Sequence, residues 1–391
     1  MDWSFLIKNK ESLNVTTDSR KVTSGSVFVA LKGEHFDGND FVEQAKAQGA
    51  EYVICGENAL AELQDLARAW RRELGLPILA ITGTNGKTTT KELCAAVLKT
   101  KYNLYYTQGN LNNQLGVPLT LLSITRAHEM AIVEMGASHP GDIKELVEIA
   151  EPDYGLITNV GRAHLQGFGS FEGVMRTKAE LYDWLDAHDG VLFQNIDNPH
   201  LKQMLAQSME SVGHPKTIIS YTTGVMPDGT HLVGAYNAEN VSAALCVGAY
   251  FDIPQEQALA AIRAYVPSNN RSQFVQTERN SVVVDAYNAN PTSMQAAIDA
   301  FKGDCYILGA MRELGEYSHL EHQNIVNMLL ERKADEVLLV GNEYQETTAP
   351  YPVFGTVDEL YTYLEHHPIN GRSILLKGSR STQMEKILPL L

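Results

Sequence analysis

The stretch PILAITGTNGKTTTKEL, residues 77–93, has the residue types of a phosphate-binding loop. An apolar strand leads into a turn with two glycines, and Lys87 and Thr88 open a helix. The backbone N–H groups and the helix N-terminus would face an anion, the lysine adds a mobile charge, and Thr88 is placed to hold Mg²⁺. The usual spacing would put a glycine at Ile81, so this loop is shorter than the common pattern. A glycine-rich turn with a surface lysine is the alternative interpretation.

Two more polar side chains follow apolar strand candidates. Glu134 lies in EMAIVEMG at 129–136, and His164 follows YGLITNVG at 154–161. Because ligands bind beyond the carboxyl ends of parallel strands, both side chains and the phosphate loop would share one rim of the sheet. A carboxylate there is a natural second support for a phosphate-bound Mg²⁺. The alternatives are a surface acid at a strand end and a structural histidine.

Polar clusters recur at three other places. QGNLNNQLGVPLTLL at 108–122 puts three asparagines before an apolar helix, which indicates either contacts at a cleft or an elaborate helix start. Asp285 ends a strand in VVVDAYNANPTS, where Rossmann-like units often contact a nucleotide; a polar turn is the alternative. The S-x-x-E pattern from Ser318 to Glu321 predicts a capping box, with the two neighbouring histidines on the helix surface and no metal site.

Strand and helix patterns alternate along the chain, which favours mostly parallel sheets with helices on both faces. We therefore expect an α/β protein of three domains: a small α/β domain at 1–75, a central phosphate-loop domain at 76–265 and a C-terminal Rossmann-like domain at 266–391. Four strands are expected after residue 280. The other expected strands are 25–31, 50–55, 129–136, 154–161 and 189–195, and the expected helices are 40–49 with Asp40 as N-cap, 142–150, 171–185, 237–251 and 254–265.

The composition excludes several classes of protein. The 391 residues are 44% hydrophobic and 20% charged, which is ordinary for folded domains. Lys and Arg number 31 and Asp and Glu 47, and the resulting charge of −16 disfavours nucleic acid as a partner. The first segment, MDWSFLIKNKESLN, has an early acid and only a short apolar run, so we expect no signal peptide. No apolar run reaches the ~18 residues of a membrane helix, so we expect no membrane insertion. The four cysteines form no C-x-x-C pair, which fits a reducing cytoplasm, and we expect a cytoplasmic monomer.

Eight segments occur in the order found in Mur ligases, and the chain resembles that family over all three domains. The shortened G-T-N-G-K-T loop is itself typical of the family. The segments are TDSR (17–20), LKGEHFDGNDF (31–41), ITGTNGKTTTKEL, GNLNNQLGVPLTLL, VEMGASHPGDI, NVGRAHLQGFGSFEGVMRTKAEL, DAYNANPTSM and LLKGSRSTQME.

The resemblance implies an ATP-dependent ligase of peptidoglycan synthesis that forms an amide bond. Within the family, the segments are most similar to the members that join D-alanyl-D-alanine to UDP-N-acetylmuramoyl-tripeptide. ATP would phosphorylate the C-terminal carboxylate of the nucleotide-linked peptide, and the amine of the dipeptide would attack the acyl phosphate. A carboxylate is unreactive toward amines, and the mixed anhydride supplies a good leaving group.

The resemblance also implies roles for single residues. The implied ATP contacts are Gly83, Thr84, Asn85, Gly86, Lys87, Thr88, Thr89, Asn237, Asn240, Arg271 and Asp285. Two Mg²⁺ ions would be held by Thr88, Glu134, His164 and a carbamylated Lys178, because a carbamate offers anionic oxygens where an ammonium would be repelled. The implied catalytic residues are Lys87, His164, Lys178 and Arg271, and the implied UDP-sugar contacts are Ser19 and Arg20. Nothing in composition or spacing selects Lys178, so an ordinary helix-surface lysine is its alternative.

Alternatives remain open at the level of function. One is the neighbouring family member that adds the third amino acid, although Asp197-Asn198-Pro199 is followed by His200 and lies in the wrong domain for its Asp-Asn-Pro-Arg motif. Another is a noncatalytic phosphate-loop sensor of nucleotides. Segments near 1–16, 55–60 and 221–231 are shorter than the family pattern, either through natural trimming or through absent loops. The third peptide residue is open between lysine and diaminopimelate.

Overall fold

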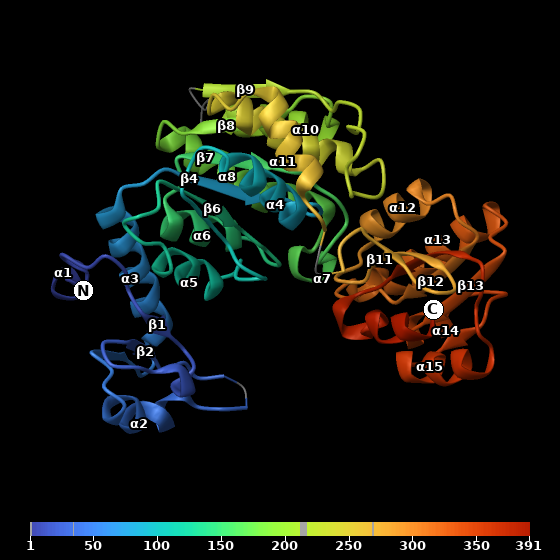
Figure 1. Cartoon of the computed structure of the whole chain (residues 1–391), viewed down its shortest axis with the longest axis horizontal. Helices are drawn as coiled ribbons and strands as arrows, with labels where there is room; N and C mark the ends of the chain where they lie inside the picture. Colours follow the sequence, from blue (N-terminus) through green and yellow to red (C-terminus); the bar gives the residue numbers. More distant parts are fainter. Residues whose placement is uncertain (1, 34, 212–216, 268–269) are drawn as a thin grey trace.

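The computed structural model describes residues 2–33, 35–211, 217–267 and 270–391, and these form three α/β units (Figure 1). The small N-terminal unit and the C-terminal unit both adjoin the central unit. The short helix α7 (Leu165–Phe168) lies where the central unit meets the C-terminal one. The α/β class and the three-unit organisation expected from the sequence are confirmed.

The N-terminal unit is built on a three-stranded parallel sheet. Its small core contains Phe28 and Ala45, both buried. The helix expected at 40–49 starts earlier, as a 3-10 turn, so Asp37 and not Asp40 is the cap, and its carboxylate accepts a hydrogen bond from the Asn39 N–H at 3.0 Å. The elements are β1 (Val15–Thr16), η1 (Ser19–Lys21), β2 (Val27–Val29), η2 (Gly38–Phe41), α2 (Val42–Ala47) and β3 (Tyr52–Ile54).

Two helices tie this unit to the central one. α1 (Ser4–Ile7) and α3 (Ala59–Leu74) share one buried core with the central sheet. Trp70 of α3 is fully buried and its indole N–H donates to the carbonyl of Ile124 at 2.9 Å. Arg71 of the same helix donates to the carboxylate of Asp153 at 2.9 Å. Because α3 is packed along its length, the N-terminal unit is firmly joined to the central sheet.

The central unit carries six parallel strands in the order β5-β6-β4-β7-β8-β9. Every residue of β4 is buried, as expected for a parallel strand covered by helices on both faces. The strands are β4 (Ile78–Thr82), β5 (Leu104–Tyr106), β6 (Met130–Glu134), β7 (Tyr154–Ile157), β8 (Val191–Asn195) and β9 (Thr217–Tyr221). The other helices are α4 (Lys87–Leu98), α5 (Gly116–Leu122), α6 (Asp142–Ala150), α8 (Phe171–Ala187), α9 (Pro199–Ser211), α10 (Asn237–Tyr250) and α11 (Gln255–Ala264).

The C-terminal unit is a second six-stranded sheet, ordered β10-β11-β15-β12-β13-β14, and only β10 at its edge is antiparallel. The four strands expected after residue 280 are present as β11, β12, β13 and β15. The strands are β10 (Gln273–Gln276), β11 (Ser281–Asp285), β12 (Cys305–Gly309), β13 (Glu336–Val340), β14 (Val353–Phe354) and β15 (Ser373–Lys377). The helices are α12 (Pro291–Ala300), η3 (Gly315–Tyr317), α13 (Ser318–Glu331), α14 (Asn342–Gln345), α15 (Val357–His366), η4 (Arg380–Thr382) and η5 (Met384–Leu390).

One local prediction in this unit is wrong. The capping box from Ser318 to Glu321 does not form, because η3 runs directly into α13 and Ser318 lies inside the helical turn rather than before it. His322 is completely buried instead of lying on the helix surface, and its Nε2 accepts a hydrogen bond from the Met311 N–H at 3.0 Å. His319 does lie on the surface. In the part of the chain described here, no helix combines the length and apolar character needed to span a membrane.

Candidate active site

The phosphate loop connects β4 to α4, and its two glycines are required by close backbone approaches. Gly83 has φ +141°, and a Cβ there would lie 2.0 Å from the hydroxyl of Thr158. Gly86 has φ +78°, and a Cβ there would lie 2.5 Å from Oδ1 of Asn240. Both conformations are unfavourable for other residues, so this short loop has no room for a side chain at either position.

Two side chains that follow β7 fix the middle of the loop. The N–H of Asn85 donates to Oδ1 of Asn159 at 3.0 Å, and the hydroxyl of Thr158 donates to the Asn85 carbonyl at 2.6 Å. The loop is therefore held in one shape before any ligand arrives. The N-terminus of α4 begins directly after it, which leaves backbone N–H groups to face an anion.

Lys87, the first residue of α4, bends back over the loop. Its Nζ donates to the carbonyls of Gly83 and Thr84 at 2.8 and 2.9 Å. The pKa of Lys87 is lowered to about 8, mainly by burial; Glu134 opposes the shift and the nearby charge of Arg271 adds to it. The lysine is thus close to its titration range at neutral pH and would gain from an anionic partner.

Glu134 ends β6 and is 1% exposed. Its Oε1 accepts from the hydroxyl of Thr88 at 3.2 Å and from the amide of Asn112 at 2.8 Å. Its Oε2 is buried and has no hydrogen-bond partner among the described residues, with Lys91 Nζ 3.9 Å away. A buried carboxylate oxygen left open beside a threonine hydroxyl suits a hard cation such as Mg²⁺, so these residues fit a metal site.

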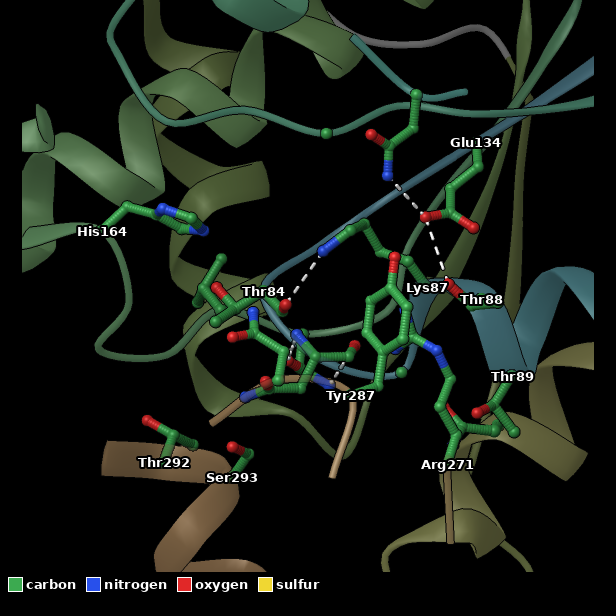
Figure 2. A pocket seen from close by; sticks show the side chains of 18 of the residues that line it. Thr84, Lys87, Thr88, Thr89, Glu134, His164, Arg271, Tyr287, Thr292 and Ser293 are labelled. Carbon is green, nitrogen blue, oxygen red and sulfur yellow. Dashed lines mark hydrogen bonds between the residues drawn. The ribbon is translucent and has the colours of Figure 1, made fainter. Parts of the chain in front are cut away.

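His164 lies on the opposite side of the cavity from Glu134 (Figure 2), and Lys178 lies on α8. His164 has φ +50° and precedes α7; its ring contacts the carboxylate of Glu313 from the C-terminal unit. Burial lowers the pKa of His164, and the charges of Lys87 and Lys178 add to that effect while Glu313 opposes it.

Lys178 is 2% exposed on α8, so it is not the surface lysine of the alternative interpretation. Within the described part of the chain its ammonium makes no hydrogen bond or ion pair, and it lies 5.8 Å from the ring centroid of Phe168. Burial, together with the charge of Lys87, holds the pKa of Lys178 well below its usual value. Both effects favour the neutral amine over the ammonium.

The C-terminal unit supplies the opposite wall. The guanidinium of Arg271 lies over the ring of Tyr287, 3.7 Å from its centroid. Asp285 ends β11, forms an ion pair with Lys377 at 2.5 Å and accepts a hydrogen bond from the Ser272 N–H at 3.2 Å. Both Arg271 and Asp285 face the phosphate loop across the gap between the units.

These side chains line one cavity of about 630 Å³. Figure 2 shows Lys87 and Tyr287 at its centre, His164 on one side, and Glu134 and Arg271 on the other. Gly83 and Lys178 are not among its lining residues. Of the residues expected from the sequence, those that line it are Thr84, Asn85, Gly86, Lys87, Thr88, Thr89, Glu134, His164, Asn237, Asn240, Arg271 and Asp285.

Ser19 and Arg20 lie apart from this cavity, in the N-terminal unit. The guanidinium of Arg20 pairs with the carboxylate of Asp18 at 2.8 Å, yet 85% of its side chain remains exposed. The Arg20 hydrogen bonds lower the pKa of Asp18 to about 2. The pair therefore presents a charged, accessible guanidinium on the surface of that unit.

The central and C-terminal units meet through polar contacts around the phosphate loop. Asn290 Nδ2 donates to Asn85 Oδ1 at 2.7 Å, which joins the loop itself to the last unit. Arg162 pairs with Glu321 at 3.0 Å, and its backbone N–H donates to the Thr292 hydroxyl at 2.9 Å. The two halves of the cavity are thus held together in this structure.

Comparison with known proteins agrees with this geometry. The chain matches the Mur ligase family catalytic domain over residues 13–97, the Mur ligase middle domain over 81–248 and the Mur ligase glutamate ligase domain over 270–380. It is 33% identical to the UDP-N-acetylmuramoyl-tripeptide–D-alanyl-D-alanine ligase of Bacillus subtilis strain 168, over 96% of this chain and 92% of that protein.

The chain belongs to the Mur ligase family. Among solved structures, MurF from Acinetobacter baumannii is similar with 30% identity and a TM-score of 0.82, covering 96% of this chain and 92% of that one. MurF from Thermotoga maritima in complex with ADP is similar with 26% identity and a TM-score of 0.84, covering 98% of each chain.

Asn290 was noted in the sequence as part of a polar cluster after Asp285, but three other residues that border this cavity or contact its lining were not singled out. Tyr287 and Glu313 come from two loops of the C-terminal unit and Lys377 from the end of β15, and they reach the site only because that unit docks against the central one. Neighbouring glycines and prolines in the sequence predicted turns near these residues. Nothing in the spacing of these residues gave a signal for contact with the phosphate loop.

A second cavity of about 450 Å³ adjoins the first on the C-terminal side. His164 and Tyr287 line both cavities. The new wall carries two guanidinium groups and two hydroxyls, contributed by Arg312, Arg380, Ser379 and Ser381. This second cavity therefore holds two guanidinium groups, of which that of Arg312 is paired with Glu343, beside the carboxylate of Glu313.

Proposed function

We propose that the protein is an ATP-dependent ligase that joins D-alanyl-D-alanine to UDP-N-acetylmuramoyl-tripeptide through an acyl phosphate. One observation carries this proposal: the phosphate loop, Glu134 and His164 of the central unit share a cavity with Arg271 of the C-terminal unit. Such an arrangement suits phosphoryl transfer between two bound substrates. The 33% identity with a ligase of that name over 92% of its length supports the choice of substrates.

Phosphoryl transfer to a carboxylate needs positive charge around the transferred group. Lys87 bends over the loop and would release its contacts to the Gly83 and Thr84 carbonyls in order to bind the β- and γ-phosphates. Arg271 faces the same position from the other unit. With charge supplied from two sides, the carboxylate oxygen can attack the γ-phosphorus, ADP leaves, and the amine of the dipeptide then displaces phosphate from the acyl carbon.

Mg²⁺ would be held by Thr88 and Glu134, whose open Oε2 provides an anionic oxygen. An ion bound there would neutralise phosphate charge and polarise the phosphoryl oxygens. A second ion would be held by His164 and Lys178. Because no three His, Cys, Asp or Glu side chains cluster among the described residues, a second ion would need another donor besides His164.

A carbamate on Lys178 would supply that donor. A neutral lysine amine adds to CO₂ and loses a proton, so the side chain becomes an anion that can bind a cation. The low pKa of Lys178 favours the reactive amine, and its lack of hydrogen-bond partners among the described residues leaves the nitrogen unengaged. Carbamylation would also remove the repulsion between Lys178 and Lys87.

The remaining substrate parts have separate places. The second cavity, with Arg312 and Arg380, would hold the carboxylate of D-alanyl-D-alanine beside the acyl phosphate. The N-terminal unit, residues 1–75, would hold the UDP end through Ser19 and Arg20. These assignments put the two substrates on opposite sides of the phosphate loop, with the reacting carboxylate between them.

The deciding experiment measures phosphate release from ATP with UDP-N-acetylmuramoyl-tripeptide, with and without D-alanyl-D-alanine. We expect release only when both are present, with lysine and diaminopimelate forms of the tripeptide compared side by side. L-alanyl-L-alanine serves as the control dipeptide. Release that did not depend on the dipeptide would refute the ligase proposal, and a nucleotide sensor would show no stimulated release at all. Addition of a free diamino acid to the dipeptide precursor would instead identify the ligase of the third amino acid.

A further inference from the structure

Tyr287 lies between the two cavities and lines both. Its ring carries the guanidinium of Arg271 at 3.7 Å from the centroid, and that of Arg380 lies at 5.2 Å. Figure 2 shows the ring of Tyr287 next to the Arg271 side chain, in the middle of the cavity. Tyr287 is therefore the aromatic contact of an arginine that faces the phosphate loop.

The Arg271 side chain has little else to hold it. Its Nε is buried without a hydrogen-bond partner, and in the described part of the chain it forms no ion pair. Its backbone is well anchored, since the neighbouring Ser272 donates its N–H to Asp285 and contacts the hydroxyl of Tyr236 at 2.6 Å. Because the backbone at Arg271 is fixed and its guanidinium has no polar partner among the described residues, the face of the Tyr287 ring is the contact that orients the guanidinium.

We propose that Tyr287 is a positioning residue, whose ring holds the guanidinium of Arg271 toward the terminal phosphate of ATP. This proposal rests on the proposed function for the identity of the nucleotide. A guanidinium stacked on an aromatic face loses less freedom when it binds phosphate, because its plane is already fixed. The hydroxyl of Tyr287 makes no hydrogen bond within the described residues, so the ring alone carries the effect.

The test compares Tyr287→Leu with the matched control Tyr287→Phe, which keeps the ring and removes only the hydroxyl. Calorimetry measures the affinity for Mg²⁺ with a nonhydrolysable ATP analogue and, separately, with ADP. We expect Tyr287→Leu to weaken binding of the analogue about 2- to 30-fold, the range of a cation–π contact, and to change ADP binding less than twofold. Tyr287→Phe should match the unmodified protein. Because a general loss of structure would weaken both nucleotides, their ratio separates positioning from misfolding.

A double variant shows whether Tyr287 acts through Arg271. In an Arg271→Ala background, adding Tyr287→Leu should cause no further loss of analogue affinity. A further loss of the same size, or an unchanged ratio of analogue to ADP affinity in Tyr287→Leu alone, would overturn the proposal. These binding measurements need no ligase activity. If the unmodified protein shows no dipeptide-dependent phosphate release, the proposed function fails while the role of Tyr287 is still decided.

Discussion

Asn290 performs two tasks that a pair of substitutions can separate. Its Oδ1 caps α12 by accepting from the Ser293 N–H at 2.9 Å, and its Nδ2 donates to Asn85 in the phosphate loop at 2.7 Å. The return bond from Asn85 is long, at 3.4 Å. Asn290→Ser keeps an oxygen for the cap but is too short to reach the loop. Asn290→Ala removes both contacts.

The expected magnitudes follow from these contacts. One good hydrogen bond and one weak one contribute about 1 to 1.5 kcal/mol to docking of the C-terminal unit, a factor of about 5 to 12 in the equilibrium constant for docking and at most that in the docked fraction. Loss of the cap costs about 1 kcal/mol of folding stability. Asn290→Ser should therefore lower turnover up to about tenfold with little change in unfolding free energy, and Asn290→Ala should add a loss of about 1 kcal/mol in stability.

The assay combines urea unfolding with phosphate release under saturating substrates. Small-angle scattering with and without ligands reports the docked fraction directly. Turnover of Asn290→Ser equal to that of the unmodified protein would refute the view that this contact couples the phosphate loop to the C-terminal unit. Equal destabilisation by both substitutions would show that serine cannot replace the cap, and the comparison would then move to Asn85→Ala, which leaves α12 intact.

Three further outcomes are expected. Lys178→Ala should abolish turnover because no carbamate can form, with partial recovery in added bicarbonate or a short-chain acid; turnover close to normal would rule out the carbamate. The pKa of Lys87 is about 8, so the free protein loses the ammonium that phosphate needs as the pH rises above that value. ATP affinity measured by calorimetry should therefore be constant below about pH 7.5 and fall by up to about tenfold per pH unit above about pH 8. A constant affinity up to about pH 9.5 would contradict the role of Lys87 in binding phosphate. Gly83→Ala should destabilise the central unit by at least about 2 kcal/mol in chemical unfolding, since its Cβ would meet the Thr158 hydroxyl at 2.0 Å; a smaller effect would mean that β7 moves aside.

The central part of the site was predictable because one rule of topology governs it. The carboxyl ends of parallel strands lie at the same edge of a sheet. Once the sheet is recognised, β4, β6 and β7 therefore bring the phosphate loop, Glu134 and His164 together. The two glycines of the loop also indicated a tight turn from the sequence, since a short turn against a neighbouring strand leaves no room for side chains. Strand order therefore explains this half of the cavity.

The other half depends on docking, which no local pattern encodes. Asn290 and Glu313 reach the central unit only across a domain boundary, and Lys178 was suggested by family resemblance alone. The prediction for His322 failed for a related reason: a helix-surface pattern gave no sign that the loop at Met311 would fold over the ring. Short strands such as β14 also carry too few residues to show a period of two.

The contact between the central and C-terminal units consists largely of hydrogen bonds and ion pairs, such as Asn85 to Asn290 and Arg162 to Glu321. The large buried cores of the described residues each belong to one side of this contact, and across it Tyr317 packs on the small apolar cluster around Phe168. When the two units separate, the groups exposed to solvent are therefore mostly polar or charged groups, which can form hydrogen bonds with water instead. A ligase that must admit nucleotide and release ADP in every cycle can open at this contact with only a small change in heat capacity. Opening also exposes no large apolar patch, among the described residues, that would favour association with other proteins.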